Sequence, residues 1–340
     1  MTANAQARTP RTTREPQLDE LRLLAKVARM YHERGIRQPQ IAAELNLSQP
    51  RVSRLLKHAA ELGIVRTVVT MPGGVHGELE DALQEKYGLR DVVVVDTTSE
   101  TDIMAVLGSA AASYLDVTLL GGHVVGISSW SETLLNAVDR MPRKSAAVVD
   151  RVVQILGGLG DPAAQVQATR LTARFAELTG GMPVYLPAPG VVGSAATRRA
   201  MMADPTVREV TASWSELTDA VVGIGSLEPS PLLQRSGNAM ADEEQAELRR
   251  RGAVGDVCFR YFDADGNPVA SKFDRRVIGI TADQLLAVPR RIGVAGGARK
   301  FQAVRAACRG GWVNVLITDL DLARRLTEPS TEACHSQTSA

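Results

Sequence analysis

Apolar residues in the N-terminal part of the chain recur at the i, i+3, i+4, i+7 spacing of amphipathic helices. This spacing predicts a helix over 19–35, a short helix over about 38–45 and a third helix over 48–63. Ser48 is a favoured N-cap residue, and Asn46 tolerates the left-handed conformation that a tight turn needs. The face of the first helix that is expected to point inward carries Leu21, Leu24, Ala25, Ala28 and Tyr31.

The run IVRTVV (64–69) then predicts a strand, because four of its six residues are apolar and β-branched. Two short helices joined by a tight turn and followed by such a strand are typical of a winged helix-turn-helix.

A different pattern begins near residue 91, where short β-branched runs alternate with helical segments. Fully apolar strands separated by helices predict a parallel sheet covered on both faces, so the larger part of the chain is expected to be an α/β, Rossmann-like domain. The predicted strands are 91–96, 123–128, 151–156, 182–187, 220–225, 291–297 and 313–319. The segment 256–269 differs, because its two strand-like arms flank Asp265-Gly266 and predict an inserted hairpin.

These patterns divide the chain into five expected parts. They are an arm over 1–17, a winged helix-turn-helix over 18–70, a linker helix within 71–90, an α/β domain over 91–326 and a tail over 327–340.

Composition narrows the class of protein without changing this picture. Of 340 residues, 44% are apolar and 23% are charged, with a net charge of +1, which is typical of a globular protein and excludes disorder. No apolar stretch is long enough to span a membrane and no signal peptide is recognisable, so a cytoplasmic protein is expected. Three separate cysteines and five scattered histidines predict neither a disulfide framework nor a zinc site.

The small net charge hides an asymmetry along the chain. Residues 1–70 hold twelve Lys and Arg against six Asp and Glu, whereas the remainder holds 27 basic and 32 acidic residues. A basic head on an acidic body indicates that the head meets a polyanion.

The third predicted helix carries side chains suited to DNA on its polar face. Arg can bind guanine edges bidentately, Gln suits adenine, and Lys suits phosphate. A solvated face of an ordinary helical bundle is the alternative, but the turn chemistry and the one-sided display together favour double-stranded DNA. The predicted DNA-binding residues are Gln49, Arg51, Ser53, Arg54 and Lys57.

The α/β part carries Gly-rich turns between strands and helices, at 121–122, 157–160, 223–225 and 296–297. Such turns let backbone amides approach an anion. No dinucleotide fingerprint follows the first strand and no P-loop pattern occurs, so no cofactor and no nucleotide hydrolysis are expected. A dyad of His123 and Asp256 is conceivable, but no spacing forces these two residues together.

On these residues the chain resembles the SorC family of bacterial sugar-responsive transcriptional regulators. The resemblance covers about 20–326 through the head 23–66 and, among others, VVGISSWSETL (124–134), QILGGLGD (154–161), VVGIGSLEP (221–229) and GVAGGARK (293–300). It implies a tetramer that binds a phosphorylated sugar, with an effector domain similar to sugar-phosphate isomerases and deaminases that have lost catalysis. Independently, one small head reads only a short half-site, so a palindromic operator and a homo-oligomer, a dimer at minimum and in keeping with the family a tetramer, are expected.

The resemblance also transfers an effector site residue by residue. The phosphate loop of the family corresponds to 128–133, its polar contact after the Gly-Gly turn to Gln167, and a basic loop residue to Arg235. The acid that engages sugar hydroxyls corresponds to Asp256, and the lysine that opens the late helix to Lys300. The implied effector-binding residues are Ser128, Trp130, Ser131, Glu132, Thr133, Gly157, Gly158, Gln167, Arg235, Asp256 and Lys300.

Two positions depart from the pattern of phosphate-binding relatives. Leu156 stands before Gly157, where a basic residue is common, and Glu132 puts a carboxylate into the anion-binding loop. A sugar, a polyol or a sugar phosphate therefore all stay open as the effector. Six transferred residues also have a plain alternative. Lys300, Arg235 and Gln167 are then surface side chains, Asp256 is a local cap, Trp130 is core, and Glu132 is an exposed first-turn acid favoured by the helix dipole.

An enzyme is the alternative function, namely a sugar-phosphate isomerase or deaminase fused to a DNA-binding head. An isomerase needs a general base near the reacting carbon. The turn after Gly225 reads SLEPSPLL and offers no Asp or His directly after the glycine. The sequence therefore predicts a regulator with no catalytic residues that controls a carbohydrate-metabolism operon.

Overall fold

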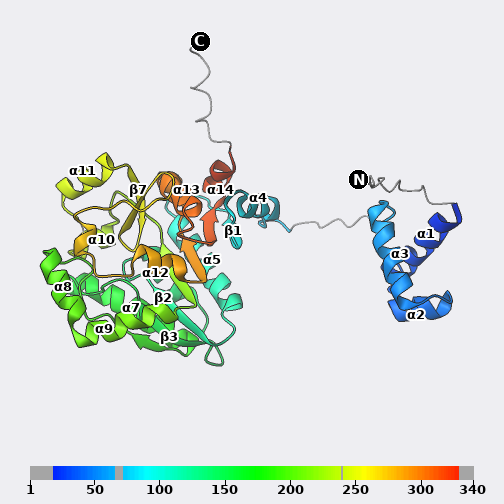
Figure 1. The fold of residues 1–340 in the computed structure, drawn as a ribbon, viewed down its shortest axis with the longest axis horizontal. Coiled ribbons are helices and arrows are strands. Elements are labelled where there is room, and N and C mark those ends of the chain that lie inside the picture. Colours follow the sequence, from blue (N-terminus) through cyan, green and yellow to red (C-terminus); the bar gives the residue numbers. More distant parts are fainter. Residues whose placement is uncertain (1–17, 66–71, 239, 329–340) are drawn as a thin grey trace, which may run out of the picture. The chain divides into compact units, whose positions relative to one another are not determined.

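The computed structural model describes residues 18–65, 72–238 and 240–328, which belong to two compact units, 1–70 and 71–340 (Figure 1). Most of the strand predicted over 64–69 lies outside the described residues, as do the predicted arm and most of the predicted tail.

The first unit contains the three predicted helices, α1 (Leu18–His32), α2 (Gln38–Glu44) and α3 (Gln49–Glu61). Asn46 adopts φ +55°, as the tight turn between α2 and α3 requires. Ser48 is the N-cap residue of α3 by position, but its side chain makes no capping hydrogen bond. Tyr31, predicted to face inward, is exposed, because Val27 and Met30 turn the buried face of α1 toward α2.

The second unit is built on a parallel sheet of seven strands, and all seven correspond to predicted strands. Across the sheet their order is β1-β10-β9-β5-β2-β3-β4, and every neighbouring pair is parallel. The strands are β1 (Asp91–Val95), β2 (His123–Ile127), β3 (Val149–Gln154), β4 (Met182–Val184), β5 (Asp219–Gly223), β9 (Arg290–Val294) and β10 (Val315–Asp319).

Helices cover both faces of this sheet, as the fully apolar strands predict. One face packs against α5 (Ile103–Thr118), α6 (Glu132–Arg140) and α7 (Pro162–Thr179). The other face packs against α4 (Gly77–Tyr87), α9 (Pro205–Ala212), α12 (Ala282–Ala287), α13 (Phe301–Arg309) and α14 (Leu320–Thr327).

Helix α4, the helix predicted between the two domains, packs within the second unit beside β1 and α14 (Figure 1). Leu83 is fully buried there. The ammonium of Lys86 and the hydroxyl of Tyr87 donate hydrogen bonds to the carbonyl of Leu326, at 2.8 and 3.0 Å. The helix thus closes the β1 edge of the second unit.

A smaller antiparallel sheet extends from the end of β5 and consists of β6 (Gly225–Ser226), β7 (Ala253–Val257) and β8 (Arg260–Asp263). The turn predicted at Asp265-Gly266 is present. Gly266 adopts φ +87°, and the chain then runs back along β8, where the amide of Val269 donates to the carbonyl of Tyr261. The tighter turn between β7 and β8 was not predicted. It is formed by Cys258 and Phe259, two non-glycine residues with φ of +53° and +62°.

Three further helices and three 3₁₀ segments connect these elements. They are α8 (Ala195–Ala203), α10 (Pro231–Arg235), α11 (Asp242–Arg250), η1 (Ser213–Glu216), η2 (Asp274–Arg276) and η3 (Ala298–Lys300).

Candidate functional site

The outer face of α3 is polar and solvent-exposed. All five residues predicted to bind DNA, from Gln49 to Lys57, are exposed, whereas Val52 and Ala59 on the opposite face are buried. Among the described residues, Lys57 forms an ion pair only with Glu61, an exposed pair at 4.0 Å, and such pairs are weak. The guanidinium of Arg51 has no hydrogen-bond or ion-pair partner within the described residues, so this face is open to bind phosphates and base edges.

The second candidate site lies between β2 and β5, where the order in which the chain adds strands to the sheet reverses. From β2 the chain steps outward to β3 and β4, and from β5 it steps the other way to β9 and β10. In open α/β sheets, ligands bind outside the carboxyl ends of the strands at such a switch point. The carboxyl ends of β2 and β5 lie side by side here, and the loop 128–133 follows β2.

This loop divides its side chains between support and the start of α6. Trp130 is buried and donates its indole N–H to the carbonyl of Gly157 at 2.9 Å, so its polar atom is used inside the protein. Ser131 is the N-cap residue of α6 and accepts the amide of Leu134 at 3.3 Å. Ser128 and Thr133 are buried on either side. Of these residues, Glu132, the first residue of α6, is the one whose side chain lies near other charged groups.

Glu132 faces two cations from later segments. Its carboxylate lies 3.7 Å from the guanidinium of Arg235, which is the last residue of α10 and is largely exposed. Its charge also acts on Lys300, the N-cap residue of α13 after β9. The structure therefore brings together residues that follow three neighbouring strands, β2, β5 and β9.

Asp256 joins this group from β7. Its carboxylate accepts the amide of Phe259 at 2.9 Å, and it lies so close to Gly225 that a Cβ there would meet Asp256 Oδ1 at 2.0 Å. Burial raises the pKa of Asp256 to about 6, against the opposing effects of the Phe259 amide and of Lys300. Burial lowers the pKa of Lys300, and Asp256 partly offsets this shift. The charges of these two side chains thus act on each other where burial removes part of their solvation. We use the name carboxyl-end cleft for the group formed by Glu132, Arg235, Asp256 and Lys300.

Three other predicted effector residues, Gly157, Gly158 and Gln167, are less available to a ligand than Asp256 and Lys300. The amide of Gly157 donates to the carbonyl of Ile278 at 2.9 Å, so it is not free. A Cβ on Gly158 would meet the side chain of Gln154. Gln167 lies on α7 and makes no side-chain hydrogen bond to any described residue. No hydrogen bond or ion pair joins Gln167 to Asp256 or Lys300 in the part of the chain that the structure describes.

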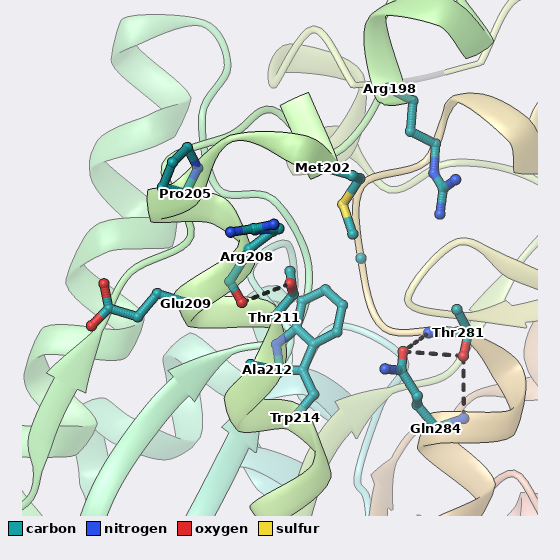
Figure 2. Close-up of a pocket in the computed structure, with 11 residues that line it drawn as sticks. Arg198, Met202, Pro205, Arg208, Glu209, Thr211, Ala212, Trp214, Thr281 and Gln284 are labelled. Atoms are coloured by element: carbon teal, nitrogen blue, oxygen red, sulfur yellow. Dashed lines mark hydrogen bonds between the residues drawn. The ribbon is translucent and has the colours of Figure 1, made fainter. Parts of the chain in front are cut away.

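A separate pocket of about 660 Å³ lies between α8, α9, η1 and the start of α12 (Figure 2). Arg198, Arg208 and Trp214 line it, and the Arg198 Nε donates to the carbonyl of Val277 at 2.7 Å. The Thr281 hydroxyl and the Gln284 side chain hydrogen-bond to each other on the opposite wall (Figure 2). No pattern in the sequence predicts this pocket, since its residues come from separate helices with ordinary surface patterns.

His123 and Asp256, conceivable as a dyad, lie at opposite ends of the strands. His123 begins β2, and its Nδ1 is 2.6 Å from Asp219 Oδ2 at the start of β5. The Arg290 guanidinium lies 2.5 Å from the other oxygen of the buried Asp219. This charged cluster joins β2, β5 and β9 at their amino ends, away from the carboxyl-end cleft.

The described part of the chain contains neither a candidate metal site nor a candidate membrane span. Among residues 18–65, 72–238 and 240–328, no three His, Cys, Asp or Glu side chains are grouped to hold a metal ion. No helix described by the structure is both long and apolar enough to cross a membrane.

Comparison with known proteins places these sites in context. Residues 75–328 match the family model described as "Putative sugar-binding domain". The chain is 35% identical over 310 residues to the deoxyribonucleoside regulator of Bacillus subtilis, covering 91% of this chain and 98% of that protein. It is 29% identical over 314 residues to the sorbitol operon regulator of Klebsiella pneumoniae, with the same coverage.

The structural comparison agrees over nearly the whole chain. The crystal structure of the full-length sorbitol operon regulator SorC from Klebsiella pneumoniae is similar with a TM-score of 0.68 and 27% sequence identity. The similarity covers 91% of this chain and 100% of that chain.

Proposed function

The chain belongs to the SorC family of sugar-binding transcriptional regulators, and we propose that it controls a carbohydrate-metabolism operon in response to a small effector. Its relatives are named as regulators of transcription, not as enzymes. The names of two relatives, a deoxyribonucleoside regulator and a sorbitol operon regulator, support a sugar, polyol or sugar phosphate as the effector. Because its target is DNA, the protein acts in the cytoplasm.

The observation that carries the proposal is the exposed polar face of α3. Gln49, Arg51 and Arg54 near its N-terminal end are suited to base edges in the major groove, and Lys57 is suited to the phosphate backbone. Ser53 lies between them on the same exposed face. One such helix contacts only a short half-site, so a palindromic operator read by a homo-oligomer, a dimer or a tetramer, follows.

The carboxyl-end cleft supplies the effector site in this proposal. Asp256 and Glu132 accept hydrogen bonds from hydroxyl groups, while Lys300 and Arg235 donate them. Ser131 and Thr133 at the start of α6 offer further hydroxyls, and Ser128, Trp130 and Gly157 support the loop that holds them. An effector that bridges segments after β2, β5 and β9 favours one conformation of the second unit over another.

The test is a gel-shift titration on an operator fragment selected from random DNA by the wild-type protein. Arg51→Ala and Arg54→Ala should each weaken operator binding by about 1–3 kcal/mol if they read bases. Lys57→Ala should weaken all sequences alike and flatten the dependence on salt. Normal operator binding by all three variants would contradict the DNA-binding role of α3.

The effector half of the proposal is tested on the same complex. Lys300→Ala should bind the operator as the wild type does, yet lose the response to the sugars, polyols and phosphates that alter the wild-type complex. Gln167→Ala is the matched comparison, because Gln167 makes no hydrogen bond or ion pair with the described residues of the cleft. A Lys300→Ala complex that responds at wild-type effector concentrations would move the effector site elsewhere.

A further inference from the structure

The protein fills the usual anion positions of the carboxyl-end cleft with its own carboxylates. Free amides at a helix start, together with nearby cations, normally attract a phosphate. Here Glu132 is the first residue of α6, so its negative charge already stands at that helix start beside Arg235. A phosphate bound at this point would face a carboxylate of like charge.

The Gly-rich start of η3 and α13, after Gly296 and Gly297, is occupied in the same way. The amide of Gly297 donates to Asp319 Oδ2 at 2.7 Å, and Asp319 Oδ1 accepts the amide of Leu322 at 2.9 Å. Asp319 is buried at the end of β10, and a Cβ on Gly296 would meet its carboxylate at 2.4 Å. An external anion would have to displace a built-in carboxylate to reach the Gly297 amide.

The charges that face the cleft are also balanced. Its cations are Lys300, Arg235 and Arg299, whose charge acts on Lys300. Its carboxylates are Glu132, Asp256 and Asp319, so no net positive charge is left for a phosphate dianion. Leu156, at the end of the neighbouring strand, is fully buried and adds no charge. Carboxylates that accept and an ammonium that donates suit the hydroxyl groups of a neutral polyol.

We propose that the effector is an uncharged sugar or polyol, and that Glu132 is the specificity-determining residue that excludes its phosphorylated form. This inference rests on the proposed function, because it takes the carboxyl-end cleft as the effector site. It narrows the effector class that sequence and family membership leave open.

The test measures ligand binding to the full-length protein by calorimetry and thermal shift. The probes are sorbitol with sorbitol 6-phosphate, 2-deoxyribose with its 5-phosphate, and inorganic phosphate. The wild type should show no inorganic phosphate binding at about 20 mM, and any sugar that binds should bind at least about tenfold more tightly than its phosphate. Glu132→Gln should raise the affinity for inorganic phosphate at least about tenfold, and adding Lys300→Gln should remove the gain.

Glu78→Gln is the matched control, since Glu78 is an exposed acid in the first turn of α4 and lies outside the cleft. Phosphate binding by Glu132→Gln that does not exceed that of Glu78→Gln overturns the proposal, and so does a wild type that prefers a phosphorylated probe. An operator complex that still responds to a probe, and loses the response in Lys300→Ala, upholds the proposed function independently of this result.

Discussion

Burying the Asp256 carboxylate in the candidate effector site lowers the stability of the folded protein at neutral pH. Burial raises its pKa to about 6, although the Phe259 amide donates to it and Lys300 lies nearby. The same side chain in an unfolded chain titrates near 3.8. Between these two pH values the folded protein therefore binds the proton more tightly than the unfolded chain, so stability falls as the pH rises through this window.

Asp256→Asn should remove this penalty and stabilise the second unit by about 1–3 kcal/mol at pH 7.5. At pH 5 the gain should be smaller by roughly 1 kcal/mol, because the folded wild type is then mostly protonated at this site. Urea unfolding followed by tryptophan fluorescence measures the effect, since Trp130, Trp214 and Trp312 all lie in the second unit. A gain that is equal at both pH values, or no gain, would contradict the assigned cause.

At the scale of elements, the turn at Gly266 is held by close backbone contact with the end of α13. A Cβ on Gly266 would lie 2.4 Å from the Cα of Gly310, and Gly266 adopts φ +87°. The indole N–H of Trp312 donates to the Gly266 carbonyl at 2.8 Å. The glycine is thus required for both its backbone conformation and its close approach to Gly310.

Gly266→Ala should lower the free energy of unfolding by about 3 kcal/mol, of which the left-handed conformation accounts for about 1–2 kcal/mol. Gly252→Ala separates the two causes, because Gly252 has φ +82° but nothing within 4 Å of an added Cβ. The control should lose only the conformational part. Equal losses in the two variants would show that the Gly310 contact relaxes without cost.

The elements differ in how far the sequence could predict them. The strands of the large sheet were predictable, because their β-branched runs are buried on both faces and bounded by turn residues. The turn between β7 and β8 was not, because Cys258 and Phe259 are not turn residues and their positive φ depends on the Asp256 carboxylate that binds the Phe259 amide.

The part of the candidate effector site that follows from strand order could be predicted from the sequence. Residues that follow β2, β5 and β9 meet because carboxyl ends of parallel strands share one edge. Loop conformation decides the rest: the bond between Trp130 and Gly157 turns both residues inward, and the Asp319 carboxylate takes the Gly297 amide. Neither contact follows from spacing, since each joins segments that only the folded chain brings together.

On the scale of the whole molecule, charge and function are divided between the two units. The first 70 residues carry the basic excess, and the remainder is acidic overall. Because an acidic unit is repelled by DNA, we expect DNA contact to be made by α3 and its exposed side chains. A single α3 covers a few base pairs, which is too short a site for useful specificity. We therefore expect two heads to read two half-sites on one face of the duplex.

If two heads read two half-sites, the affinity for the operator should depend on the spacing between the half-sites as well as on their sequence. Inserting about 5 base pairs between them turns one half-site to the opposite face of the DNA, and should weaken binding at least about tenfold. Inserting about 10 base pairs restores the face and should recover part of the loss. A gel-shift series on the selected operator measures this, with sedimentation of the free protein at micromolar concentration as the companion measurement. A monomer in sedimentation, or equal affinity for a single half-site and the full operator, would contradict the paired reading.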